Sequence, residues 1–245
     1  MSTATTQLHE VDQIIIPDLN IIPSTDLKLT DEHNLTVAAD ESVYRSDSPF
    51  PKLICEFTDY GYMRNIYLAR LIINPFIYNP VSKQLTVITH AIISAQFSMD
   101  NPEHYAVPNH SSINFTKLAT EMAVNSESIN ERSTPTEGSY LFVYRGSNIL
   151  PILNNLIEWK KKIGYFVHSI DIDEVGTQNS EVKAYIQNLY DNDENPPEYI
   201  CLVGDAIGDY SIPSYYEHYG YHTQCGDHEY SLLSGNDSFP DALVE

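Results

Sequence analysis

Three aspartates have the residue type and spacing that could bind a metal ion. Asp237 and Asp241 lie in the stretch GNDSFPD, and Asp205 directly follows the run YICLVG. Calcium takes about six or more oxygen ligands, from carboxylates and backbone carbonyls, on a loop that bends tightly. The Gly235–Asn236 pair is typical of such a bend. The spacing differs from that of an EF-hand loop, so a calcium loop and a solvated turn both remain open.

A second polar group lies in YHTQCGDH, where His222, Cys225 and His228 could form a zinc site or a Cys–His nucleophile pair. The spacing fits no common structural zinc pattern, and nothing in the sequence indicates a lowered thiol pKa. A polar surface loop is the favoured interpretation. The stretch LVGDAIGD contains neither G-x-G-x-x-G nor G-K-[ST], which argues against nucleotide binding.

The elements that must position these residues change character near residue 130. Before it, Leu53, Cys55 and Phe57 alternate with polar residues, and residues 66–80 and 84–97 are rich in β-branched and aromatic side chains. Asn-Pro pairs bound these runs and mark turns. We therefore expect a small antiparallel β domain that ends near Phe97. A short helix over residues 115–124 and a Ser/Asn/Glu-rich linker follow.

From Ser139 onward, strands and helices alternate. A continuous apolar run at 139–145 predicts a strand, residues 165–172 and 196–206 predict a second and a third strand, and residues 148–164 and 179–193 predict amphipathic helices. Such alternation is typical of a parallel sheet flanked by helices. Asp205 then follows the carboxyl end of a strand, where ligands of such sheets bind. The residues expected on the buried helix faces are Leu150, Leu153, Leu156, Ile157 and Ile163 in the first helix and Val182, Tyr185, Ile186, Leu189 and Tyr190 in the second, which Asn179 or Ser180 should cap.

The composition excludes some partners. With 34 acidic and 13 basic residues, the formal net charge is −21, which argues against nucleic acid and anionic membrane surfaces. The 3 cysteines form no disulfide framework. No apolar run is long enough to span a membrane, and the first 20 residues lack the features of a signal peptide.

Five segments, in order, resemble the start of the catalytic domain of gingipain-type cysteine peptidases. They are LIEWKKKIGYFVHSIDIDEVG, VKAYIQNLY, PPEYICLVGDA, IPSYY and GDHEYSLLSGNDSFPDALV. Residues 60–97 are similar to the propeptide of the same family. The resemblance implies a caspase-like α/β fold in residues 131–245, truncated within a strand, preceded by a β-rich prodomain and linker in residues 1–130.

The resemblance also implies a function. The chain is expected to be the N-terminal portion of a secreted or surface-attached cysteine endopeptidase that acts on proteins and peptides. The family's catalytic His lies in a GHG turn and its Cys follows a later strand; both are expected downstream, so this chain contains no assigned catalytic residue. The prodomain is expected to contact the catalytic domain. The alternative is a non-catalytic, calcium-stabilised binding module.

Finally, the resemblance implies a structural calcium ion. Asp205, Asp237 and Asp241 would supply carboxylates, and Ser234 and Phe239 would supply backbone carbonyls.

Overall fold

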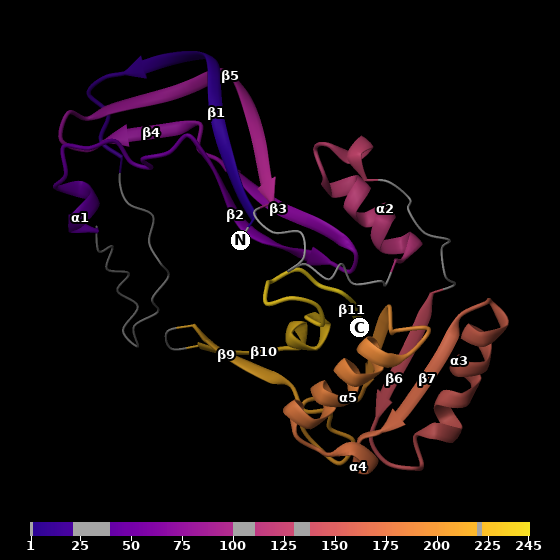
Figure 1. Ribbon diagram of the computed structural model, residues 1–245. Coiled ribbons are helices and arrows are strands. Elements are labelled where there is room, and N and C mark those ends of the chain that lie inside the picture. The colour runs from indigo at the N-terminus through magenta and orange to yellow at the C-terminus, as the bar shows by residue number, and fades with distance from the viewer. Residues whose placement is uncertain (1, 22–39, 100–110, 130–137, 220–221) are drawn as a thin grey trace. The chain divides into compact units, whose positions relative to one another are not determined.

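The computed structural model describes residues 2–21, 40–99, 111–129, 138–219 and 222–245 (Figure 1). Backbone contacts divide the chain into two compact units, one of residues 1–59 and 69–106 and the other of residues 60–68 and 107–245. The change in sequence character near residue 130 does not coincide with this division. Residues 60–68 and the helix before residue 130 belong to the second unit because their apolar side chains share a core with it.

The first unit contains an antiparallel sheet with the strand order β1-β5-β4. Its strands are β1 (Ser2–Ile16), β4 (Phe76–Asn79) and β5 (Gln84–Met99). The predicted turn between β4 and β5 is confirmed, because these strands pair antiparallel on either side of residues 80–83. The unit also contains the short helix α1 (Glu41–Tyr44), which Asp40 caps.

Strand β1 was not predicted from the sequence. It pairs with β5 from Ser2 opposite Met99 to Ile16 opposite Leu85, and the register shifts between His9 and Gln13. Most of its described side chains are exposed. The strand therefore lacks the apolar alternation by which a half-buried strand is recognised.

The hairpin of β2 (Cys55–Met63) and β3 (Ile66–Ile73) is divided between the two units. Its tip, residues 60–68, belongs to the second unit, and we call these residues the hairpin tip. Its other residues belong to the first unit.

The second unit contains a parallel sheet with the strand order β11-β8-β6-β7. Its strands are β6 (Ser139–Tyr144), β7 (Phe166–Asp171), β8 (Tyr199–Val203) and β11 (Leu243–Val244). The helices between them are α3 (Leu150–Lys162), α4 (Ile172–Val175) and α5 (Asn179–Asn192). The predicted parallel sheet flanked by helices is confirmed.

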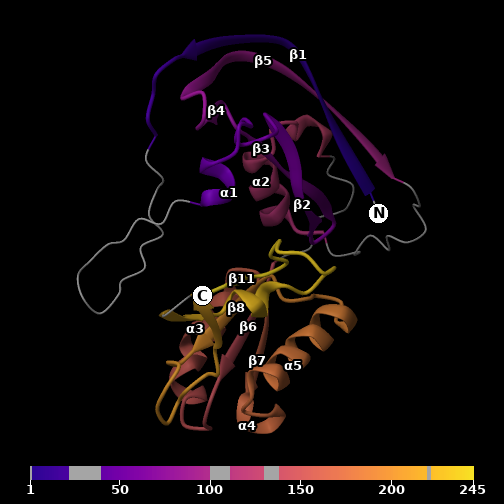
Figure 2. The same cartoon turned by 90° about the vertical axis from the view of Figure 1, so that its left-hand side faces the viewer.

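Strand β6 separates two of the cores of this unit, because successive residues point to opposite faces. One face packs on α3 and the other on α5, and Figure 2 shows these helices on either side of the sheet. The first core includes Tyr140, Phe142, Tyr144, Leu153 and Ile157, and the second includes Leu141, Val143, Val182, Ile186 and Tyr190.

Two details of the helices differ from the prediction. Leu156 and Ile163 of the first helical segment are 40% and 50% exposed, because α3 buries only the narrow stripe of Leu153 and Ile157. Helix α5 is capped by Gln178 rather than by Asn179 or Ser180. The Glu181 side chain accepts a hydrogen bond from the Gln178 N–H, which completes a capping box.

A further helix, α2 (Ile113–Met122), corresponds to the helix predicted over 115–124 and is capped by Ser112. It contributes Phe115 and Ala119 to a third core, which also contains Met63 of the hairpin tip. The remaining elements are η2 (Ser126–Ser128), β9 (Tyr215–Tyr219), β10 (His222–Gly226) and η3 (His228–Ser231).

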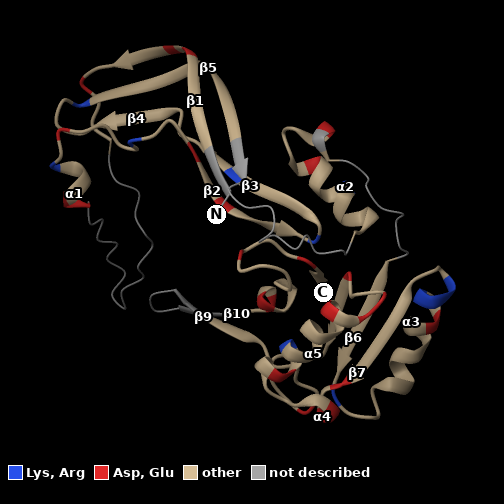
Figure 3. Cartoon of the chain, viewed as in Figure 1, with Lys and Arg blue, Asp and Glu red and all other residues tan. Residues whose placement is uncertain are grey.

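Acidic residues occur in many elements, whereas a group of basic residues lies at the end of α3 (Figure 3). Lys160, Lys161 and Lys162 form the last turn of that helix. Cations there interact favourably with the helix dipole. Within the described ranges, no helix combines the length and apolarity required to cross a membrane.

Candidate functional site

The acidic loop, residues 233–241, connects η3 to β11. Strand β11 pairs in parallel with the start of β8, where Leu243 lies opposite Tyr199. Asp241 therefore lies near the amino end of β8, whereas Asp205 follows its carboxyl end. A strand of this length separates its two ends by roughly 16 Å. The structure does not bring Asp205 together with the acidic loop, and the described residues contain no group of three or more His, Cys, Asp or Glu that could hold a metal ion.

Asp241 is completely buried and accepts three backbone hydrogen bonds. Its Oδ1 accepts from the Arg64 N–H at 2.7 Å, and its Oδ2 accepts from the N–H groups of Leu233 at 2.9 Å and Ser234 at 2.6 Å. Burial raises the pKa of this carboxyl to about 6, although the three N–H donors act in the opposite direction. The nearby Asp237 adds to the increase.

Asp237 also contacts the hairpin tip. Its Oδ2 accepts a hydrogen bond from the Tyr62 N–H at 3.0 Å, and its Oδ1 accepts from the Phe239 N–H at 2.9 Å. A Cβ atom at Gly61 would lie only 2.2 Å from the Asp237 Cγ. Glycine therefore allows the hairpin backbone to approach this carboxylate closely.

Arg64 lies in the turn between β2 and β3, with its side chain in the interior of the second unit. Its guanidinium Nη1 donates to the backbone carbonyls of Pro197 at 3.1 Å and Asp241 at 2.9 Å. The guanidinium carbon lies 5.4 Å from the ring centre of Phe115 and 5.5 Å from that of Tyr190, which is suitable for cation–π interaction. Only 2% of Arg64 is exposed. Burial lowers the pKa of its guanidinium, and Tyr190, Glu198 and Asp241 act in the opposite direction.

Glu198 is a second buried carboxylate near this arginine. It accepts a short hydrogen bond from the Ser112 hydroxyl, whose oxygen also caps α2 by accepting from the Phe115 N–H at 3.1 Å. The Glu198 N–H donates to the Ser139 Oγ at 3.2 Å. Buried charges are tolerated only when they are paired and hydrogen-bonded. This network connects α2, β6 and the start of β8 around Arg64.

Helix α5 holds the segment that enters the acidic loop. The Lys183 Nζ donates to the carbonyls of Glu229 at 2.6 Å and Leu232 at 2.5 Å, and the Gln187 Nε2 donates to the carbonyl of Leu233 at 2.7 Å. Burial lowers the pKa of Lys183. These contacts place the N–H groups of residues 233 and 234 opposite Asp241.

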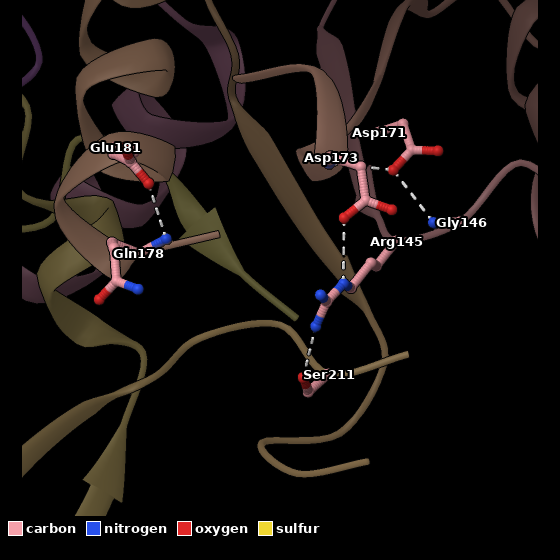
Figure 4. Close-up of polar contacts among 7 residues, drawn as sticks. All are labelled: Arg145, Gly146, Asp171, Asp173, Gln178, Glu181 and Ser211. Carbon is pink, nitrogen blue, oxygen red and sulfur yellow. Dashed lines mark hydrogen bonds and ion pairs between the residues drawn. The ribbon is translucent and has the colours of Figure 1, made fainter. Parts of the chain in front are cut away.

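A separate polar network lies after the carboxyl ends of β6 and β7 (Figure 4). The Arg145 Nε is 3.2 Å from the Asp173 Oδ1, and its Nη1 donates to the Ser211 Oγ at 3.2 Å. Asp171 accepts hydrogen bonds from the N–H groups of Gly146 and Asp173. This network, which was not predicted from the sequence, joins the loops at this edge of the sheet. The predicted ligand Asp205 is exposed and accepts from the Ala206 N–H.

The thiols do not form a Cys–His pair within the described structure. All three cysteines are free: Cys55 is buried, Cys201 is half-buried and Cys225 is exposed. Burial raises the pKa of Cys201, which disfavours the reactive thiolate. His228 Nδ1 lies 3.3 Å from the Ser231 Oγ, and the side chain of His222 lies outside the described residues.

Comparisons with known protein families identify the family of this chain. The model of peptidase family C25 matches residues 133–244, and the model of the C25 propeptide matches residues 1–134. The chain belongs to peptidase family C25. We call residues 1–134 the propeptide segment and residues 133–244 the peptidase segment.

The individual relatives share only a small part of their sequence with this chain. Lys-gingipain and Lys-gingipain W83 of Porphyromonas gingivalis are each 28% identical over 156 residues, which are 60% of this chain and 9% of each relative. The chain therefore spans less than a tenth of the length of these relatives. Among solved structures, the complex of P. gingivalis RgpB pro- and mature domains has a TM-score of 0.42 at 19% identity, covering 51% of this chain and 64% of that one. Gingipain K of P. gingivalis has a TM-score of 0.30 at 19% identity, covering 40% and 56%.

The family assignment shows that the contacts around Arg64 join residues of two different segments. Arg64, Tyr62 and Phe115 belong to the propeptide segment, whereas the acidic loop, Pro197 and Tyr190 belong to the peptidase segment. The two segments therefore share one polar network and one core inside the second unit.

Proposed function

We propose that this chain is the N-terminal portion of the zymogen of a secreted, gingipain-like cysteine endopeptidase with a caspase-like catalytic domain. The observation that carries the proposal is the match of a propeptide model to residues 1–134 followed directly by a peptidase model on residues 133–244. The parallel sheet flanked by α3 and α5 supports it.

The proposed chemistry is attack of a thiolate on a peptide carbonyl. A histidine would transfer the proton, and backbone N–H groups would stabilise the oxyanion. None of Cys55, Cys201 and Cys225 has a described histidine partner, and we expect the reacting pair downstream of residue 245. This chain alone should therefore be inactive.

The test compares residues 1–245 with the product of the continuous downstream reading frame. We expect the longer protein to hydrolyse casein after activation and iodoacetamide to abolish that hydrolysis. Residues 1–245 should show no hydrolysis above buffer. Inactivity of the activated longer protein, or activity that iodoacetamide does not affect, would contradict the proposal.

The propeptide segment would assist folding and keep the enzyme silent. In support, Met63 and Phe115 of this segment form a core together with Phe239 and Leu243 of the peptidase segment. Part of the apolar surface of the peptidase segment is therefore buried by propeptide residues.

A structural calcium ion at the acidic loop remains a proposal from the resemblance. Asp237 suits it best, because this side chain is partly exposed and a carboxylate oxygen that accepts one N–H has a further lone pair for a cation. Asp241 suits it less well, because it is completely buried. Ser234 and Phe239, whose carbonyls the resemblance assigns as ligands, donate their N–H groups to the carboxylates of Asp241 and Asp237, respectively.

Thermal unfolding in calcium, in magnesium and in chelator tests this proposal. Calcium should raise the midpoint, because a ligand that binds only the folded state stabilises it. Asp237→Ala should abolish the increment, whereas Asp205→Ala should retain it, because Asp205 lies at the other end of β8. Equal midpoints in calcium and chelator would contradict the proposed site.

A further inference from the structure

We propose that the acidic loop is a receptor for the hairpin tip, and that Arg64 is the residue that keeps the propeptide segment bound once the chain between the two segments has been cut. This inference rests on the proposed function, because it treats the chain as a zymogen. It goes further by naming the anchoring residue and the surface that accepts it.

The first argument is the conformation of Arg64. Its φ is 56°, in the left-handed region that non-glycine residues rarely occupy. Such a conformation persists only when surrounding contacts compensate for it. The buried guanidinium carries a second cost, since a desolvated cation must be paired. Both costs are offset in the docked arrangement, where Arg64 donates to Asp241 through its backbone and through its side chain.

The second argument is the match between the two backbones. The N–H groups of Tyr62 and Arg64, two residues apart, donate to the carboxylates of Asp237 and Asp241. Gly61 provides the space for this approach. Both carboxylates accept backbone N–H groups at the same end of β2. The acidic loop therefore selects the backbone conformation of the hairpin tip as well as its positive charge.

The third argument is the specificity for arginine. In the peptidase segment, the guanidinium lies at cation–π distance from the Tyr190 ring and donates to the carbonyls of Pro197 and Asp241. Phe115, the second ring at this distance, belongs to the propeptide segment itself. A planar guanidinium can stack and donate at the same time, whereas the compact ammonium of lysine cannot reproduce both contacts. The receptor therefore fits a tight β-turn that carries an arginine.

The experiment cuts the chain and measures whether the segments separate. A recognition sequence for a site-specific protease replaces residues 131–137, which the sequence predicts as a linker, and the uncut protein is purified first. After cleavage, we expect the wild-type segments to co-elute in gel filtration. Arg64→Ala should increase the dissociation rate of the propeptide segment at least 100-fold, because the buried backbone carbonyls of Pro197 and Asp241 lose their guanidinium donor. The backbone N–H at position 64 can still donate to the Asp241 carboxylate.

Arg70→Ala is the matched control, because Arg70 lies on the same hairpin and forms an exposed ion pair with Asp59. Its dissociation rate should equal that of the wild type. Arg64→Lys retains the charge and should still increase the rate at least tenfold, so the test remains informative if Arg64→Ala does not fold. Asp241→Asn should increase the rate as well. Far-ultraviolet circular dichroism before cleavage verifies that each variant is folded.

The proposal is overturned if Arg64→Lys dissociates as slowly as Arg70→Ala, or if the wild-type segments separate at once. No peptide hydrolysis is measured in this experiment. An inactive longer protein would therefore contradict the proposed function without affecting this result, and rapid release would contradict the anchor without affecting the proposed function.

Discussion

Asp241 is held between two opposing physical effects. Removal from water favours its neutral form, whereas three N–H donors favour its charged form. Burial has the larger effect, since the pKa is raised to about 6. The side chain therefore changes protonation in a mildly acidic range, where an ordinary carboxyl is already charged.

Asp241 should make the stability of the chain depend on pH. Because its folded-state pKa is raised from 3.8 to about 6, the folded state binds the proton more tightly than the unfolded state. The resulting stabilisation is complete below the unfolded-state pKa and is lost as the pH rises through the folded-state value. Between pH 7 and pH 5, the wild type should gain roughly 1 kcal/mol in free energy of unfolding relative to Asp241→Asn.

Urea unfolding at several pH values, in the presence of chelator, measures this difference. Asp205→Asn removes an exposed carboxylate at the other end of β8 and serves as the control. Its curve should follow the wild type. If the Asp241→Asn curve runs parallel to the wild type over this range, the assignment of the raised pKa to Asp241 is wrong.

Among the elements, the β2–β3 hairpin depends most on close backbone approach. Gly61→Ala would place a methyl group 2.2 Å from the Asp237 Cγ. Overpacking of this kind typically costs about 1–3 kcal/mol, and we expect a loss of that size in chemical denaturation. Gly226→Ala is the control, because no atom lies within 4 Å of the added carbon.

A double variant sharpens this prediction. In the background of Asp237→Ala, the added methyl meets less of the opposing side chain, so Gly61→Ala should cost less than it does in the wild type. Equal costs in both backgrounds would show that the two residues are not coupled.

Helix α5 depends on its capping box. Glu181→Ala removes the side-chain acceptor of the Gln178 N–H and should reduce the free energy of unfolding by about 1 kcal/mol. Glu158→Ala in α3 breaks only an exposed pair with Lys161, for which we expect less than about 0.5 kcal/mol. Similar losses for both variants would argue against a specific role of the cap.

The elements also show what could be predicted from sequence. The buried face of α5 repeats at helical spacing, so Val182, Ile186 and Tyr190 could be assigned to the core in advance. The anchoring role of Arg64 could not, because its partners Pro197 and Asp241 lie 133 and 177 positions away. A local signal did exist in retrospect: a basic residue stands alone in the turn of an apolar hairpin.

The predicted calcium ligands illustrate the same limit. Asp237 and Asp241 are close in sequence and close in the fold. Asp205 was assigned to the same group through the resemblance, but the parallel pairing of β11 with the start of β8 places it at the opposite end of that strand. Strand order and register decided this outcome, and local spacing contains neither.

For the whole molecule, the charge of −21 is the dominant electrostatic feature. Like charges at the surface repel one another in the compact state. Raising NaCl from 10 to 200 mM shortens the screening length from about 30 Å to less than about 10 Å. We therefore expect a higher thermal midpoint at the higher salt concentration, and KCl should have the same effect.

The buried partners of Arg64 should be much less sensitive to salt than the surface charges. The ratio of the dissociation rates of Arg64→Lys and wild type after cleavage should therefore change little between these concentrations.

For the salt dependence of unfolding, a thermal midpoint that falls with added salt would indicate that attractive surface pairs outweigh the repulsion.

The separation of 177 positions between Arg64 and Asp241 also has a consequence for biosynthesis. A ribosome adds about 5–20 residues per second, so Arg64 emerges roughly 10–35 s before its carboxylate partner is made. During that interval the acidic loop has not been synthesised. Met63 and Ile66 of the hairpin therefore lack the contacts that Phe239 and Leu243 make in the folded core. Factors that shield nascent apolar segments would act on this hairpin during that interval, and slowing translation between residues 64 and 241 would lengthen its period of exposure.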